Sequence, residues 1–225
     1  PENVYDFSIG NPYFPAPESV KTAILEILDT MDPLEIHGYM ANDGFPAVRQ
    51  TVADYLNETY GDDLTGDNIM MTVGAAGGMN AILKALLNPG DEVIVPAPYF
   101  LEYGHYVENY GGTLIAVPSR EEDGFMPDPA AIAAAITSKT KAMILNNPNN
   151  PTGVIYPVEV IQALAQVLEE KQAAYGTSIY LISDEPYREL AFDGAEVAYL
   201  PKYYRNTIVG YSWSKSLSLP GERIG

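Results

Sequence analysis

The sequence contains no cysteine and only two histidines among its 225 residues. The lack of cysteine excludes a disulfide framework, a thiolate nucleophile and a cysteine-ligated metal, and it agrees with a reducing cytoplasm. His37 and His105 lie far apart in the sequence and beside no carboxylate cluster, which makes a histidine-based metal site a poor interpretation. We therefore expect no metal chemistry.

Basic residues and long apolar runs are also scarce. The 12 lysines and arginines are outnumbered by 30 aspartates and glutamates, and the formal net charge of −18 opposes nucleic acid and anionic membranes as partners. No run approaches the roughly 18 apolar residues of a membrane span, and no signal segment opens the chain. We predict a cytoplasmic protein that binds neither nucleic acid nor membranes. A few backbone amides and one or two cations can still form a local site for an anionic ligand.

The hydrophobic pattern indicates an α/β fold. From about residue 67, short β-rich apolar runs alternate with helical stretches, which is typical of βαβ units and a mainly parallel sheet. The expected strands are residues 68–73, 92–96, 113–117, 142–146, 179–183 and 207–211. The expected helices are residues 19–29, 45–60, 78–87, 99–110, 129–136 and 158–171.

Three late segments place polar side chains at the carboxyl ends of predicted strands, where ligands bind in open α/β sheets. They are Asn-Asn-Pro-Asn-Asn-Pro-Thr-Gly at 146–153, Ser-Asp-Glu-Pro-Tyr at 183–187, and Ser-Trp-Ser-Lys at 212–215 with Arg223 eight residues on. In this order they resemble the signature motifs of class I/II, fold-type-I aminotransferases, which are aspartate-aminotransferase-like enzymes that depend on pyridoxal 5′-phosphate. The resemblance covers about residues 5–225.

The resemblance implies a three-layer αβα large domain. We expect residues 1–44 to form an N-terminal segment that lines the substrate site and the dimer interface, and residues 45–225 to form the cofactor-binding domain. The chain starts at Pro1 without a methionine and stops at Gly225 inside a motif-like Pro-Gly-Glu-Arg-Ile-Gly segment. We therefore expect the C-terminal small domain to be absent, and with it the arginine that binds the substrate α-carboxylate in the family.

Four residues of these motifs take roles from the resemblance. Lys215 matches the lysine that forms a Schiff base with the cofactor and then moves the substrate proton. Asp184 matches the carboxylate that keeps the pyridine nitrogen protonated, whereas Glu185 should point to the other side of the strand. Asn150 and Tyr187 match the groups that hydrogen-bond the phenolic oxygen of the cofactor. The alternatives are a capping aspartate, an Asn-Pro turn and a core tyrosine with an exposed tip.

The phosphate of the cofactor needs hydrogen-bond donors. The glycine-rich segment 74–78 can offer backbone amides and a helix N-terminus, although it lacks the hydroxyl or lysine that relatives often have there, and close packing alone would also explain it. A serine and an arginine of the third motif match hydroxyl and guanidinium contacts in the family. The candidate cofactor contacts on this side are Gly74, Ala75, Ala76, Ser212, Ser214 and Arg223.

Three more positions match the family. Phe100 matches the aromatic residue that stacks on the pyridine ring, unless it is an ordinary core residue. Tyr39, which precedes Gly44-Phe45-Pro46, matches a tyrosine that reaches the phosphate of the neighbouring subunit, and this implies a homodimer with shared active sites. Gly10 matches a glycine that lines the substrate site together with Asn150, unless it is a plain turn glycine.

The resemblance implies transfer of an amino group from an L-amino acid to a 2-oxo acid, with 2-oxoglutarate as the expected acceptor. Two other enzyme classes use the same frame, C–S lyases and aminocyclopropane-carboxylate synthases, because all begin with deprotonation at Cα. A further alternative is a non-catalytic, aminotransferase-like regulatory domain that binds the cofactor as a sensor. The amino donor stays open, since its selection depends partly on the small domain and on the partner subunit.

Overall fold

The computed structural model describes residue 4 and residues 10–225, which form two compact units. One unit is Pro1–Thr72 with Trp213–Ile224, and the other is Val73–Ser212 with Gly225. The boundary expected at residue 44 concerns function, and it stays a prediction.

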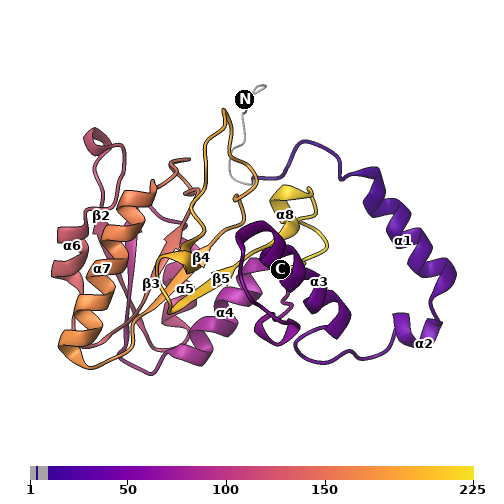
Figure 1. Ribbon diagram of the computed structural model, residues 1–225, viewed down its shortest axis with the longest axis horizontal. Coiled ribbons are helices and arrows are strands. Elements are labelled where there is room, and N and C mark those ends of the chain that lie inside the picture. Colours follow the sequence, from indigo (N-terminus) through magenta and orange to yellow (C-terminus); the bar gives the residue numbers. More distant parts are fainter. Residues whose placement is uncertain (1–3, 5–9) are drawn as a thin grey trace. The chain divides into compact units, whose positions relative to one another are not determined.

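The larger unit is built on a sheet of five parallel strands in the order β2-β1-β3-β4-β5 (Figure 1). A helix lies between most consecutive strands, as parallel pairing requires a crossover. Between β4 and β5 the crossover is a loop with the short 3-10 helix η3 (Leu200–Lys202). The strands are β1 (Glu92–Ala97), β2 (Thr113–Pro118), β3 (Thr140–Asn146), β4 (Tyr180–Asp184) and β5 (Thr207–Gly210).

Helices cover both faces of this sheet, which confirms the expected αβα layers. Ile94, Met143 and Leu145 belong to a core with the helices of one face, α6 and α7, and Val93 and Ile144 belong to a second core with the helices of the other, α4 and α5 (Figure 1). Alternate strand residues enter opposite cores, as the pleat of a strand requires. The helices are α4 (Gly74–Leu86), α5 (Glu102–Glu108), α6 (Pro129–Ala135) and α7 (Val158–Tyr175).

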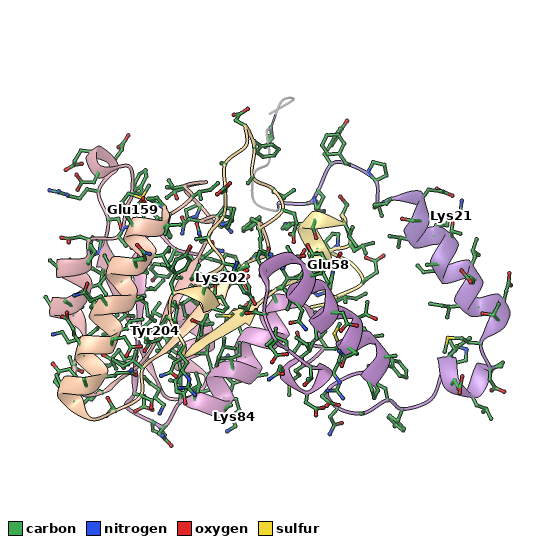
Figure 2. All side chains as sticks on the ribbon, in the orientation of Figure 1. Lys21, Glu58, Lys84, Glu159, Lys202 and Tyr204 are labelled. Atoms are coloured by element: carbon green, nitrogen blue, oxygen red, sulfur yellow. The ribbon has the colours of Figure 1, made fainter. Side chains whose placement is uncertain are left out.

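The crossover helices follow from local sequence signals. In α7 the side chains of Ile161, Leu164 and Leu168 recur at three- and four-residue steps and are buried, and Gly176 ends the helix with φ 64. Tyr204, labelled in Figure 2, is 1% exposed in the same core, and its hydroxyl donates to the carbonyl of Ile179 at 2.6 Å. The Tyr204 side chain therefore fills the core beneath α7 next to Ile179, the residue that precedes β4.

The smaller unit is helical. Arg49 on α3 is 8% exposed, donates to the carbonyl of Gly66 at 2.6 Å and pairs with Asp43 at 3.2 Å. This buried guanidinium ties the loop before α3 to the turn after it. The elements are α1 (Glu18–Thr30), α2 (Pro33–Ile36), α3 (Pro46–Tyr60), the 3-10 helix η1 (Gly66–Asn68) and α8 (Trp213–Ser216).

The strand expected at residues 68–73 is wrong. The side chain of Asn68 accepts from the backbone amide of Thr65 at 2.9 Å and so caps η1, while Met70 and Val73 are 60% and 70% exposed. A β-rich run becomes a strand only where a neighbouring strand satisfies its backbone, and this run is paired with none of the five strands. The helix expected from residue 78 begins at Gly74 instead, so the glycine-rich segment is its first turn.

Among the residues that the structure describes, no helix is both long and apolar enough to cross a membrane. Within the same residues, no group of three or more histidine, cysteine, aspartate or glutamate side chains is arranged to hold a metal ion.

Candidate active site

The carboxyl ends of three neighbouring strands bring polar groups into one row. Asn146 at the end of β3 is in register with Asp184 at the end of β4, and Asp184 is in register with Gly210 at the end of β5. Adjacent strands lie roughly 4.8 Å apart, so the row is compact. The Nδ2 of Asn146 donates to the carbonyl of Asp184 at 2.8 Å, which fixes this edge of the sheet.

Asp184 is a buried carboxylate with one oxygen unused. Its side chain points to the α4 and α5 face, where the hydroxyl of Tyr103 donates to Oδ2. Oδ1 is buried and has no hydrogen-bond partner among the described residues. Burial raises the pKa of Asp184 to about 6, and the hydrogen bond from Tyr103 acts in the opposite direction. A buried acceptor of this kind is costly unless a donor, such as a protonated ring nitrogen, completes it.

Tyr103 is a site residue that the sequence analysis missed. Burial raises the pKa of the Tyr103 phenol well above its ordinary value, with the charge of Asp184 adding to the effect, so the phenol stays protonated and donates. Its ring makes an edge contact with Phe100, with centroids 5.5 Å apart, and stacks on Tyr99 at 6.5 Å. The available signal was helical spacing, since Tyr103 follows Phe100 by three residues within the predicted helix.

Glu185 lies on the opposite face of the strand from Asp184. It is 1% exposed, accepts from the hydroxyl of Ser183 at 2.5 Å and pairs with Arg188 at 2.8 Å. Burial raises the pKa of Glu185 to about 7, while the charge of Arg188 lowers it. The two adjacent acids therefore have separate partners: Tyr103 for Asp184, and Ser183 with Arg188 for Glu185.

Asn150 and Tyr187 meet beside this row. The backbone amide of Asn150 donates to Oδ1 of Asn146 at 2.5 Å, and its Nδ2 donates to the hydroxyl of Tyr187 at 3.3 Å. Burial and the charge of Asp184 raise the pKa of Tyr187, whereas the hydrogen bond from Asn150 lowers it. The phenol of Tyr187 thus remains a donor near neutral pH, with an amide beside it.

The first turn of α4 can receive an anion. Val73, the N-cap residue of α4, makes no side-chain capping hydrogen bond, and the first turn holds no acidic residue, which suits a negative ligand beside Gly74, Ala75 and Ala76. Gly225 lies against the same turn, where an added Cβ would stand 2.6 Å from the carbonyl carbon of Gly74. Ser212, two residues beyond the end of β5, is 2% exposed.

The remaining candidates belong to the smaller unit. The Nζ of Lys215 donates to the carbonyl of Gly10 at 2.6 Å, although the two residues are 205 positions apart in the chain. Arg223 is exposed, has φ 56 and donates to the carbonyl of Pro220 at 3.0 Å. Ser214 lies in the short helix α8, and Tyr39 is fully exposed. Ser8 and Ile9, which precede Gly10 in its motif, lie outside the described residues.

The larger unit fits a pyridine cofactor with a phosphate group. The unpaired oxygen of Asp184 suits a protonated ring nitrogen, the Asn150 and Tyr187 donors suit a phenolic oxygen, and Phe100 and Tyr99 offer flat faces. The first turn of α4, which holds no acidic residue, suits a dianion. These features match pyridoxal 5′-phosphate in charge and in hydrogen-bonding pattern.

Comparison with known proteins agrees with this assignment. The family model described as aminotransferase class I and II matches residues 2–225, and members of this family use pyridoxal 5′-phosphate. A probable aspartate/prephenate aminotransferase of Thermus aquaticus is 38% identical over 216 residues, which is 96% of this chain and 54% of that protein. The chain thus spans about half the length of the curated relatives it matches.

Two solved structures resemble the chain closely. An amino transferase from Eubacterium rectale is 46% identical with a TM-score of 0.96, over 100% of this chain and 56% of that one. Aspartate aminotransferase from Thermus thermophilus with maleate is 35% identical with a TM-score of 0.87, over 96% of this chain and 54% of that one. With a family model that extends over nearly all of its residues, the chain belongs to the class I and II aminotransferases.

Proposed function

We propose that the protein carrying this chain is a pyridoxal-phosphate-dependent aminotransferase that moves an amino group from an L-amino acid to a 2-oxo acid. The observation that carries the proposal is the buried, unpaired Oδ1 of Asp184 beside the Asn150 and Tyr187 pair. When bound, the cofactor supplies an aldehyde for the amino group and a ring that accepts electrons from the substrate Cα. The other steps depend on side chains of the protein.

Asp184 holds the proton on the ring nitrogen, because a carboxylate at that atom favours the cationic ring. Tyr187 donates to the phenolic oxygen and Asn150 donates beside it, which withdraws charge from that oxygen. Phe100 would offer its flat face to the ring. The first turn of α4 holds the phosphate, with Ser212, Ser214 and Arg223 as further donors.

Lys215 would hold the cofactor through its ε-amino group, and the same amine would serve as the base that moves the proton at the substrate Cα. Its position in the chain supports this role, since it follows Ser212 by three residues and β5 by five. The carbonyl of Gly10 accepts from its ammonium group, which supports the proposed place of Gly10 at the substrate site.

The amino acceptor is proposed to be 2-oxoglutarate, and the donor an L-amino acid. The test is a half-reaction of the full-length protein with single amino acids, followed by absorbance and by assay of the 2-oxo acid. Formation of one 2-oxo acid per cofactor, reversed by 2-oxoglutarate, supports the proposal. Continuous release of ammonia with a 2-oxo acid would instead identify a lyase, and cofactor binding without any half-reaction would identify a sensor.

Replacement of Tyr103 by phenylalanine is expected to weaken cofactor binding by about 10- to 100-fold, because a charge-assisted hydrogen bond to Asp184 is lost and the acid becomes harder to ionise. The measurement is the dissociation constant of pyridoxal phosphate and of its 1-deaza analogue, which has no ring nitrogen. The analogue should bind both proteins alike. Tyr106→Phe, on the same helix, is the control, and equal weakening of both ligands would contradict the role of Asp184.

We also propose a homodimer in which Tyr39 contributes to the phosphate site of the partner. Tyr39→Ala and Lys215→Ala proteins should each be inactive alone. Mixed dimers should recover about a quarter of the wild-type rate, because about half of the dimers are mixed and each has one complete site. The measurement is activity after co-expression, with sedimentation to establish the dimer. No recovery in a preparation shown to contain mixed dimers would contradict a shared site.

A further inference from the structure

Tyr187 stands on a segment without regular secondary structure. Residues 186–189 form a turn after β4, and two backbone hydrogen bonds cross it, from the amide of Arg188 to the carbonyl of Glu185 at 3.3 Å and from Leu190 to Tyr187 at 2.8 Å. A phenol that must stay within hydrogen-bonding distance of a ligand needs side-chain anchors below it, because an unanchored turn samples many conformations.

The side chains on the far side of this turn form such an anchor, here called the Arg188 cluster: Ser183, Glu185, Arg188, Glu189 and Tyr211. Glu185 binds Ser183 at 2.5 Å and Arg188 at 2.8 Å. The Nε of Arg188 contacts Glu189 at 3.4 Å, and its guanidinium lies 4.7 Å from the centre of the Tyr211 ring. The hydroxyl of Tyr211 donates to Glu189 at 2.8 Å, which closes the ring of contacts.

The cluster is buried at its centre and tied to two strands. The side chains of Arg188 and Glu185 are 7% and 1% exposed, and the backbone amide of Glu185 donates to the carbonyl of Gly210 in β5 at 2.8 Å. Such a pair is expensive to desolvate and adds little net stability, so stability alone is a weak reason for its presence. The geometry of the Glu185–Arg188 pair can instead hold the turn in one conformation, since Tyr187 lies between these two residues in the chain.

We propose that the Arg188 cluster positions Tyr187 toward the cofactor. This inference rests on the proposed function. Glu185 and Arg188 close the turn on the side opposite Asp184, while Tyr211 covers the guanidinium and connects the turn to the chain that leads to Ser212. Glu185 and Arg188 are positioning residues, because their side chains bind each other and Ser183, whereas the side chain of Asp184 binds Tyr103.

The test is a double-mutant cycle between Tyr187→Phe and the combined variant Glu185→Gln/Arg188→Met. The combined variant removes both charges together, so no unpaired charge is left buried. Each change is expected to lower kcat/KM by about tenfold, the value of one hydrogen bond, and the triple variant by about tenfold as well. A positioning cluster loses its effect once the phenol it positions is gone.

A spectroscopic measurement accompanies the kinetics. The pH at which the visible absorbance of the bound cofactor changes should rise by about one unit in Tyr187→Phe, by a similar amount in the combined variant, and no further in the triple variant. The control is Arg120→Met/Asp123→Asn, which removes an exposed arginine and acid pair of the same spacing, 2.7 Å apart. It should shift neither quantity.

The outcomes separate the two proposals. If Tyr187→Phe leaves the absorbance change where it is in the wild type, the proposed role of Tyr187 fails and the positioning role fails with it. If Tyr187→Phe moves it and the combined variant does not, the proposed function stands and the positioning role is wrong. Fully multiplicative losses in the triple variant also overturn the positioning role, since they show that the cluster acts without Tyr187.

Discussion

Replacement of Lys215 by alanine will lower transamination by at least about 10⁴-fold in the full-length protein, because alanine has no amine to hold the cofactor aldehyde and no group to move the substrate proton. General base catalysis alone contributes roughly 10²- to 10⁴-fold, and loss of the covalent step adds to it. Cofactor affinity should fall far less, since Asp184, Asn150, Tyr187 and the first turn of α4 are unchanged. The expected protein therefore binds the cofactor and does not turn over.

The attachment of the cofactor gives a second measurement of the same prediction. Reduction of the wild-type protein with borohydride should fix the cofactor on the peptide that contains Lys215, and the alanine variant should release all of its cofactor on denaturation. Lys202→Ala is the matched control, because Lys202 is an exposed lysine of η3 (Figure 2). A labelled peptide without Lys215, or turnover within tenfold of wild type, would contradict the assignment.

Much of the fold could be predicted because strand and helix signals are local. Short β-rich apolar runs predicted six strands, of which five form the sheet, and the alternation of side chains along a strand predicted that Asp184 and Glu185 point to opposite faces. The strand expected at residues 68–73 failed for a non-local reason, since an extended run needs a paired neighbour and this run is paired with none of the five strands.

The site could be predicted only where its residues follow the ends of strands. Asp184 and Asn150 are marked by their motifs, whereas the contact of Tyr103 with Asp184 joins residues 81 positions apart and leaves no local pattern. The Arg188 cluster combines contacts that the sequence reveals with contacts that only the fold creates. The spacing of Glu185 and Arg188 is visible in the sequence, but the covering ring of Tyr211 depends on β5 lying beside β4.

Replacement of Asp184 by asparagine is expected to affect catalysis and stability in opposite directions. Activity should fall by roughly 2 to 4 orders of magnitude, which corresponds to a few kcal/mol of lost stabilisation of the protonated ring. Asparagine keeps the size of the side chain and can still accept from Tyr103, so the loss reports the charge rather than the packing. An activity loss below tenfold would contradict the role of Asp184 at the ring nitrogen.

The stability of the apo-protein should respond in the other direction, because Asp184 without a ligand is a buried carboxylate with an unpaired oxygen. Its pKa is raised from 3.8 to about 6, so the native state resists its ionisation. The group therefore favours the folded state below about pH 4, and this contribution is lost as the pH rises through 6. The shift corresponds to about 3 kcal/mol of unfolding free energy at high pH, which removal of the carboxylate would restore. Burial of the asparagine amide offsets about 1–2 kcal/mol of this.

The measurement is urea unfolding of the apo-proteins at pH 4 and pH 8. Asp184→Asn should be more stable than wild type by about 1–2 kcal/mol at pH 8 and should show no gain at pH 4. Burial also raises the pKa of Glu185, to about 7, and the charge of Asp184 adds to this shift. Loss of that charge in Asp184→Asn eases the ionisation of Glu185, so this effect on stability at pH 8 has the same sign. Glu26→Gln, a change at an exposed acid of α1, is the control. A variant that is less stable than wild type at pH 8 would show that Asp184 is satisfied without a ligand, and the buried oxygen would then be no sign of a binding site.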